Sequence, residues 1–150
     1  MLDIPNYKEI TARNVIFDLN GTLAVDGQVD KEVLDLLKEL SKTYKIVVLT
    51  ADTLGNAKEI FKGLDSISLE IIRDTEEKTK VAKKYIPYIS IGNGNNDIGV
   101  FENAQLSIAV IGKEGCSTKL LLSADVVVCD IVDAINLLLK KKRLIATLRR

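Results

Sequence analysis

Polar side chains able to bind a phosphate or a metal ion follow several apolar runs of this chain, at the point where each run ends. They are Asp18 and Asn20, Thr50, and the segment Gly92–Asp97. A lysine, Lys78 or Lys80, opens the helix predicted before the last of these runs. Ligand crevices of open α/β sheets lie at the carboxyl ends of the strands, so we expect these groups to converge. A carboxylate, a hydroxyl, an ammonium group and an oxygen-rich loop suit a phosphoryl group together with Mg²⁺.

The segment Val15–Leu23 carries the strongest of these signals, because an apolar run long enough for a buried strand ends there on a carboxylate. Gly21 lets the backbone turn sharply after Asp18 and come close to a bound group. Asp, Asn and Gly also favour ordinary turns, so the alternative interpretation of this segment is a simple strand-to-turn junction.

The chain contains no histidine. This excludes Ser-His-Asp and Cys-His catalysis, imidazole-based zinc hydrolysis and general acid–base catalysis by histidine. Any catalysis must therefore use carboxylates, hydroxyls, amines, amides or a hard metal ion.

Apolar runs alternate with amphipathic segments along the whole chain, which predicts an α/β fold with a central parallel sheet covered on both faces by helices. The predicted strands are Val15–Leu19, Ile46–Thr50, Ile67–Ile72, Ile89–Ile91, Ser107–Ile111 and Asp125–Cys129. The predicted helices are Lys31–Lys42, Thr53–Lys62, Glu76–Tyr85, Asp97–Asn103, Thr118–Leu122 and Ile131–Arg143. The first dozen residues are expected to form a short edge element.

The bulk properties predict one cytoplasmic domain over residues 1–150. A length of 150 residues suits a single core, and 47% apolar with 28% charged residues is the balance of a soluble globular protein. The formal net charge of zero gives no reason to expect binding to nucleic acid or to an anionic membrane. Aspartates interrupt the apolar stretch 120–139, so we expect no membrane span. Cys116 and Cys129 lack metal-ligand spacing, and the chain opens without a signal peptide; we expect both thiols to be reduced core residues.

These motifs, taken in order, resemble the four motifs of the haloacid dehalogenase (HAD) superfamily. They are Asp18–Leu23, Thr50, Lys78 and Gly92–Asp97, and the resemblance covers residues 15 to 130. The segment Leu49–Asp52 is similar to the Thr-Gly-Asp segment of the P-type ATPase phosphorylation domain, and Ala109–Gly115 and Ala124–Val128 also look like that branch. The chain is most similar to the soluble, stand-alone relatives of P-type ATPases. The resemblance implies a three-layer Rossmann-like HAD fold.

The resemblance also implies a role for each motif residue. Asp18 would be the nucleophile that becomes an aspartyl phosphate. Phosphate would be held by Thr50, Ala51, Lys78 and Gly21, with Lys80 as the alternative to Lys78. Mg²⁺ would be bound by Asp18, the backbone carbonyl of Asn20, Asn93 and Asp97, the last directly or through water.

Two residues depart from the family pattern, and both departures point away from efficient hydrolysis. Phosphatases of the family carry a second aspartate at position 20, which acts as general acid and base, but the Asn20 amide does not titrate. General acid–base catalysis typically supplies about 10²–10⁴-fold, so we expect slow turnover. Asn93 replaces an aspartate that usually binds Mg²⁺, which removes a charge. Asp52 and Asp74 could compensate, although each is also well placed to cap a helix.

The alternative is a catalytically degenerate HAD domain that binds phosphate or a nucleotide, or regulates a partner. In either case the short connection between Leu23 and Ile46 leaves no room for a cap domain. A capless, open site implies a phosphorylated small molecule enclosed by a homo-oligomer, or a phosphoprotein, as substrate. The tail Lys140–Arg150, with six basic residues in eleven, is expected to be a solvated helix end or a surface that packs on a neighbouring subunit.

Overall fold

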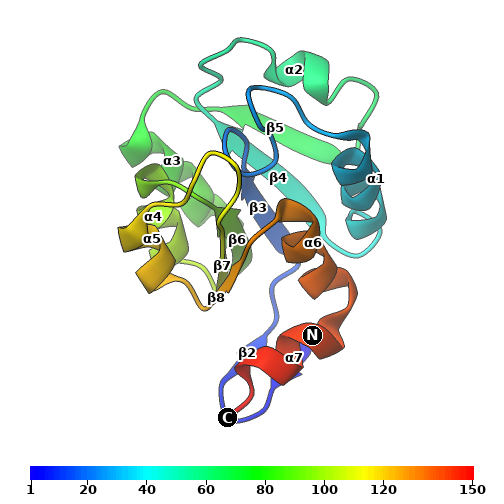
Figure 1. Cartoon of the computed structure of the whole chain (residues 1–150), viewed down its shortest axis with the longest axis vertical. Helices are drawn as coiled ribbons and strands as arrows, with labels where there is room; N and C mark the ends of the chain where they lie inside the picture. Colours follow the sequence, from blue (N-terminus) through cyan, green and yellow to red (C-terminus); the bar gives the residue numbers. More distant parts are fainter.

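Six parallel strands form the central sheet of the computed structural model, which describes all 150 residues (Figure 1). In sheet order they are β5 (Ile67–Ile71), β4 (Lys45–Thr50), β3 (Asn14–Asp18), β6 (Tyr88–Gly92), β7 (Leu106–Val110) and β8 (Val126–Val128). The chain winds outward from β3 to β5 on one side and from β6 to β8 on the other. Because β3 and β6 are neighbours, the order reverses between them, which is where such sheets place a ligand crevice.

Helices cover both faces of the sheet, which confirms the predicted three-layer α/β architecture. On one face lie α1 (Lys31–Leu40), α2 (Ala57–Ile60), α6 (Ile131–Leu139) and α7 (Lys141–Leu148). On the other lie α3 (Thr75–Ala82), the 3-10 turns Lys83–Tyr85 and Asn95–Asp97, α4 (Ile98–Glu102) and α5 (Thr118–Ser123). The helices are all too short or too polar to span a bilayer.

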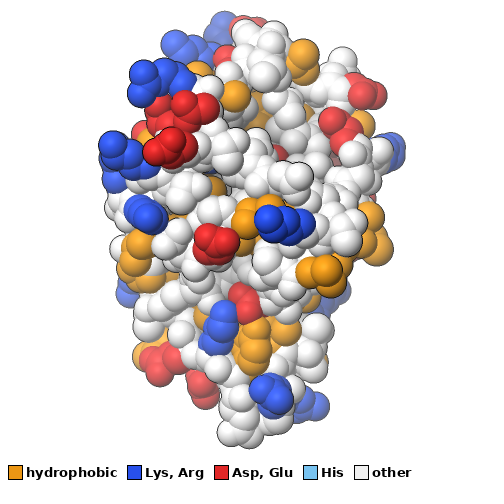
Figure 2. Space-filling model, turned by 90° about the vertical axis from the view of Figure 1, so that its left-hand side faces the viewer, with side chains coloured by type: hydrophobic (Ala, Val, Ile, Leu, Met, Phe, Trp, Pro, Cys, Tyr) orange, Lys and Arg blue, Asp and Glu red, His pale blue; other side chains and the backbone are white.

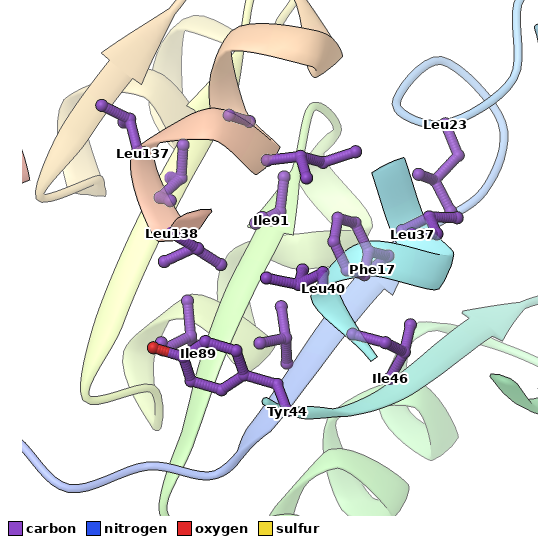
Figure 3. Close-up of a cluster of buried hydrophobic side chains, with 14 of the residues drawn as sticks. Phe17, Leu23, Leu37, Leu40, Tyr44, Ile46, Ile89, Ile91, Leu137 and Leu138 are labelled. Carbon is purple, nitrogen blue, oxygen red and sulfur yellow. The ribbon is translucent and has the colours of Figure 1, made fainter. Parts of the chain in front are cut away.

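The main core lies between the sheet and the pair α1 and α6 (Figure 3). Alternate strand residues such as Phe17 and Ile91 point to this face, where α1 presents Val33, Leu37 and Leu40 at helical spacing. The intervening strand residue Ile16 points to the opposite face, toward α3 and α4. Burial on both faces explains why these strands are continuous apolar runs, and it holds the ends of β3 and β6 in fixed positions.

The six strands lie within one residue of the predicted bounds, but two predicted helices are wrong. The helix predicted over Thr53–Lys62 is reduced to α2, because Asp52 adopts a left-handed backbone (φ 51°) and its carboxylate accepts a hydrogen bond from the amide of Ala57 at 3.0 Å. The helix predicted over Ile131–Arg143 breaks at Lys140. The break lets α7 turn back, so that Leu144 packs into the main core.

The first dozen residues do not join the main sheet, contrary to expectation. They form a separate antiparallel hairpin of β1 (Leu2–Ile4) and β2 (Lys8–Ile10), which lies beside α7 at the end of the molecule where both termini meet (Figure 1). The two cysteines are also not core residues, since Cys129 is exposed and Cys116 only half-buried. The edge position of β8 and the short α5 leave them near the surface.

Asp125 connects the hairpin to the sheet by hydrogen bonds. One oxygen of its carboxylate accepts hydrogen bonds from the Tyr7 hydroxyl and, at 2.8 Å, from the Lys8 ammonium group. The other oxygen accepts from the amide and the hydroxyl of Ser107 at 2.9 and 3.2 Å. Burial by itself would raise the pKa of Asp125, but the bonds from Lys8, Tyr7 and Ser107 outweigh it and hold the pKa below its usual value.

We predict that Asp125→Asn lowers the free energy of unfolding by about 1–3 kcal/mol at pH 7, because it leaves charged and polar partners unsatisfied. The lowered pKa stabilises the fold above the ordinary aspartate pKa, and this contribution is lost as the pH falls through the folded-state value. The difference between native protein and variant should therefore shrink in acid. Urea unfolding at pH 7 and at pH 3 measures it, with the exposed Asp65→Asn as control. A difference that is the same at both pH values contradicts the prediction.

Candidate active site

Asp18 stands at the carboxyl end of β3, at the position where the strand order reverses. In the sheet register it lies opposite Leu49 of β4, and the preceding residue Phe17 lies opposite Ile91 of β6. Thr50 therefore comes one residue beyond Asp18 on one side, and the segment Gly92–Asp97 follows directly on the other. The structure thus brings the three predicted strand ends to one edge of the sheet.

Lys78 joins Asp18 to Asp97. Its ammonium nitrogen lies 2.8 Å from Asp18 Oδ1 and 2.7 Å from Asp97 Oδ1. All three side chains are buried, and Lys78 is only 1% exposed. The alternative residue Lys80 is exposed, on the outer side of α3, and contacts neither carboxylate. Lys78 is therefore the lysine that the fold brings to the site.

Two carboxylates and one ammonium group leave one excess negative charge in this buried cluster. Burial, followed by the charge of Asp97, raises the pKa of Asp18 to about 7, although Lys78 opposes the shift. Burial by itself would lower the pKa of Lys78, but the two carboxylates outweigh it and raise that pKa. The cluster is therefore an environment that favours a further positive charge beside Asp18.

Asp97 shapes the loop after β6 as well as holding Lys78. Its Oδ2 atom accepts hydrogen bonds from the backbone amides of Asn93 and Gly94 at 3.2 and 3.1 Å. A methyl group on Gly92 would lie 2.6 Å from the same oxygen. Only glycine at this position therefore leaves room for the Asp97 carboxylate beside the loop. Both oxygens of Asp97 are thus engaged within the protein, one by Lys78 and one by the loop.

Asn93 and Thr22 complete the cluster on the other side of Asp18. The Thr22 hydroxyl lies 3.3 Å from Asp18 Oδ2 and 3.1 Å from Asn93 Oδ1, so it can donate its one proton to either. The Asn93 amide nitrogen donates to the carbonyl of Gly115 at 3.1 Å, and its backbone carbonyl accepts from the amide of Ser117 at 2.8 Å. An aspartate at position 93 could not make the bond to Gly115, because it has no N–H group.

Thr50 is buried, and its hydroxyl oxygen accepts a hydrogen bond from the amide of Asp52 at 3.0 Å. The hydroxyl proton stays available for a ligand. Ala51 is exposed beside it. Asp52 and Asp74 do not reach the cluster: Asp52 accepts from the amide of Ala57, and Asp74 caps α3 by accepting from the amide of Glu77 at 2.8 Å. Asp74 is thus the helix cap that its alternative interpretation predicted, whereas Asp52 is a loop carboxylate and the N-cap residue of α2 is Asn56.

The Asn20 side chain is partly exposed and makes no hydrogen bond to another residue. It is therefore not part of the fixed hydrogen-bond network of the site. Its backbone pairs with Ala24, and the Gly21 amide donates to the carbonyl of Ala24 at 2.9 Å. For Thr22 and for the turn at Gly115 the sequence motifs predicted no role in the site. The one sequence feature that indicates the contact of Thr22 with Asp18 is their separation of four residues across the turn at Gly21.

The oxygen donors of the site fit a hard divalent cation. Asp18 Oδ2 and Asn93 Oδ1 lie within hydrogen-bond distance of one hydroxyl group, and the cluster has one uncompensated negative charge. Nowhere in the chain do three or more Cys, Asp or Glu side chains gather in a way that could hold a metal ion. The donors would therefore have to include amide and backbone oxygens together with Asp18.

We predict that Gly21→Ala is more destabilising than Gly63→Ala, although both glycines have a φ of +82°. The left-handed backbone costs an alanine about 1–2 kcal/mol at either position. At position 21 the new methyl carbon would also lie 2.3 Å from the amide nitrogen of Asn93, whereas at position 63 nothing lies within 4 Å. Urea unfolding of both variants measures the difference. Equal losses of stability contradict the contact between Gly21 and Asn93.

Comparison with solved structures finds close matches of fold at low sequence identity. The 3-deoxy-D-manno-octulosonate 8-phosphate phosphatase of Moraxella catarrhalis, solved with magnesium, phosphate and the sugar acid, has a TM-score of 0.67 at 18% identity, over 91% of this chain and 92% of that one. The corresponding phosphatase of Haemophilus influenzae, in a cobalt-bound form, has a TM-score of 0.68 at 18% identity, over 89% and 88%. A haloacid dehalogenase-like family hydrolase of Streptococcus pneumoniae has a TM-score of 0.59 at 16% identity, over 83% and 97%.

In sequence, the chain is 57% identical over 61 residues to an uncharacterized protein of Methanocaldococcus jannaschii. The match covers 41% of this chain and 66% of that protein. No model of a protein family matches the sequence. The chain is thus similar to these hydrolases in structure: it has the three-layer fold of the HAD-family hydrolases.

Proposed function

We propose that this protein is a Mg²⁺-dependent phosphohydrolase or phosphotransferase of the HAD type that forms an aspartyl phosphate on Asp18. The observation that carries the proposal is the buried cluster in which Lys78 lies between Asp18 and Asp97. A fold does not need this cluster for its packing, since buried ion pairs add little stability over apolar side chains of similar size. The HAD-family hydrolase fold and the phosphatases among its structural neighbours support the same chemistry.

In the first step an oxygen of the Asp18 carboxylate attacks phosphorus. The bond from phosphorus to the leaving group breaks, and the leaving group takes the electron pair. The Lys78 ammonium group and the Thr50 hydroxyl would stabilise the negative charge on the phosphoryl oxygens, and Lys78 would keep Asp18 oriented. Bound Mg²⁺, held by Asp18, the carbonyl of Asn20 and Asn93, would supply positive charge that offsets the charge of the phosphoryl group.

In the second step water attacks phosphorus, and the bond to Asp18 breaks. Inorganic phosphate leaves, the carboxylate is restored and one proton passes to solvent. Asn20 can hold the water by a hydrogen bond but cannot remove its proton, so the aspartyl phosphate should break down slowly. Activated donors such as acyl phosphates need no protonation of the leaving group and are the preferred donors in this proposal.

Asp97 acts in this proposal as a positioning residue, because both its oxygens are engaged by Lys78 and the loop amides. A direct metal ligand would instead need an oxygen that is free to bind the metal. A water molecule between Asp97 and the metal would be compatible with the same contacts. We also propose a functional similarity to the soluble relatives of P-type ATPases. With Asn20 in place of an aspartate, the chain would share with them a persistent aspartyl phosphate.

A second candidate is a module that binds phosphate without turning it over. The amides at positions 20 and 93 favour it, since each stands where the family pattern has a carboxylate. In both cases only the turn after β3 and α1 separate β3 from β4, so the site entrance has no cap in this proposal. Substrate would then be a phosphoprotein, or a small phosphorylated molecule enclosed by a homo-oligomer.

We predict that incubation with acetyl phosphate and Mg²⁺ adds one phosphoryl group to the native chain and none to Asp18→Ala. Intact-mass spectrometry measures the adduct, and a chelator should prevent it. Asp52→Asn, which changes a neighbouring carboxylate outside the cluster, serves as the matched control and should still be modified. Neither adduct nor phosphate release from several donors would favour the binding module. Release without an adduct would contradict the expected slow hydrolysis.

We predict that Asn20→Asp raises the rate of phosphate release, by up to about 10²-fold, because it restores a general acid and base. The gain should be larger for p-nitrophenyl phosphate than for acetyl phosphate, whose leaving group needs less protonation. Asn96→Asp adds the same charge at an exposed position of the neighbouring loop and is the control. An equal gain in both variants would assign the effect to charge alone, against the proposed role of position 20.

A further inference from the structure

A groove runs along α3, between this helix and the segment formed by α4 and α5. Its volume is about 920 Å³, and Ile98 is its one apolar lining side chain. Three lysines line it, Lys80 and Lys83 from the α3 side and Lys119 from α5, against one acid, Glu76. We call it the lysine groove, after Lys80, Lys83 and Lys119.

The three lysines of this groove carry charge that the protein does not neutralise. All three are exposed, and none forms an ion pair, whereas other basic residues such as Lys8 and Arg73 do. With Glu76 included, the groove carries two excess positive charges in a chain whose net charge is zero. Figure 2 shows this side of the molecule, where Lys and Arg side chains gather along the upper left margin with acidic groups among them.

The groove is lined by residues of the same elements that carry the site. Thr75 and Thr79, which line it, flank Lys78 on the same helix, and Asn95, which also lines it, belongs to the loop that Asp97 shapes. Gly99 lets the two walls approach, since a methyl group there would lie 2.2 Å from the Thr79 hydroxyl. From Thr75 to Lys83 the helical rise is about 12 Å. An extended polypeptide of about four residues covers that length.

We propose that the lysine groove binds an acidic segment of a polypeptide whose phosphorylated side chain enters the site at Asp18. The inference rests on the proposed function and names its substrate class, a phosphoprotein. Carboxylates of the segment would pair with Lys80, Lys83 and Lys119, and the Asn95 side chain would offer hydrogen bonds to its backbone. The phosphoryl group would then be brought to Lys78 and Thr50 from the same end of α3.

A polypeptide fits this groove better than a nucleic acid does. No aromatic side chain lines it, so bases would have no surface on which to stack. Glu76 would repel an evenly spaced row of phosphates, while a segment of mixed sequence can place an uncharged residue beside it. Exposed ion pairs are individually weak, so the groove would add affinity through several pairs at once.

The test uses the full chain with Lys80, Lys83 and Lys119 all changed to Gln. The control changes Lys31, Lys38 and Lys58 to Gln, three exposed lysines on the opposite face with the same total charge. Binding of a fluorescent peptide with three glutamates on each side of one phosphoserine is followed by anisotropy, with hexaglutamate and a thymidylate hexamer as further probes. The groove variant should bind both peptides about tenfold more weakly, as three exposed ion pairs predict, and the control variant should not.

Phosphorylation of Asp18 by acetyl phosphate is measured on the same proteins, because this small donor has no acidic polypeptide segment that would need the groove. If the groove variant loses peptide affinity while no protein is phosphorylated, the groove is upheld and the proposed function fails. If phosphorylation occurs but both variants bind the peptides like the native chain, the groove proposal is overturned. Tighter binding of the thymidylate hexamer than of the peptides, lost in the groove variant, also overturns it in favour of nucleic acid.

Discussion

The ion triad of Lys78 with Asp18 and Asp97 is the interaction on which the site depends. It joins three elements, β3, α3 and the loop after β6, at the point where the strand order of the sheet reverses. Removing one member of a buried ion pair typically costs about 3–5 kcal/mol, because the partner charge is left uncompensated. The triad therefore links the candidate site to the stability of the fold. It also sets the electrostatics, since its burial and, after that, the charge of Asp97 raise the pKa of Asp18 to about 7.

The remainder of the site is arranged around this triad by backbone contacts. Asp97 gathers the amides of Asn93 and Gly94, and Asn93 in turn holds the turn at Gly115 through its amide group. The asparagine at position 93 thus has a structural role that an aspartate could not fill, at the expense of a charge for the metal. Asn20 differs, because its side chain makes no internal bond. Position 20 can therefore be changed with little effect on the fold. A variant at this position tests the activation of water separately from stability.

The carboxyl and amino ends of the strands contact different parts of the protein. At the carboxyl edge the strands end on the residues of the candidate site, while at the amino edge Asp125 binds the terminal hairpin through Tyr7 and Lys8. The hairpin and α7 enclose the end of the main core, where Leu144 is fully buried. This arrangement keeps the chain termini away from the site. The lysine groove lies along α3, on the face of the sheet opposite to α7.

The sequence determined the sheet, because strands buried on both faces must be continuous apolar runs, and it determined that Asp18, Thr50 and the segment 92–97 follow those runs. Periodicity also predicted α1, whose apolar stripe is local. Tertiary structure decided what depends on contacts distant in the chain. The choice of Lys78 over Lys80 follows from the rotation of α3 against the sheet, and the contact of Asp18 with Lys78 spans 60 residues. The hairpin is held by Asp125 across 118 residues, and α7 breaks away because Leu144 finds a buried place beside that hairpin. Local pattern cannot encode such choices, since they are settled by which side chains the packed elements bring within reach.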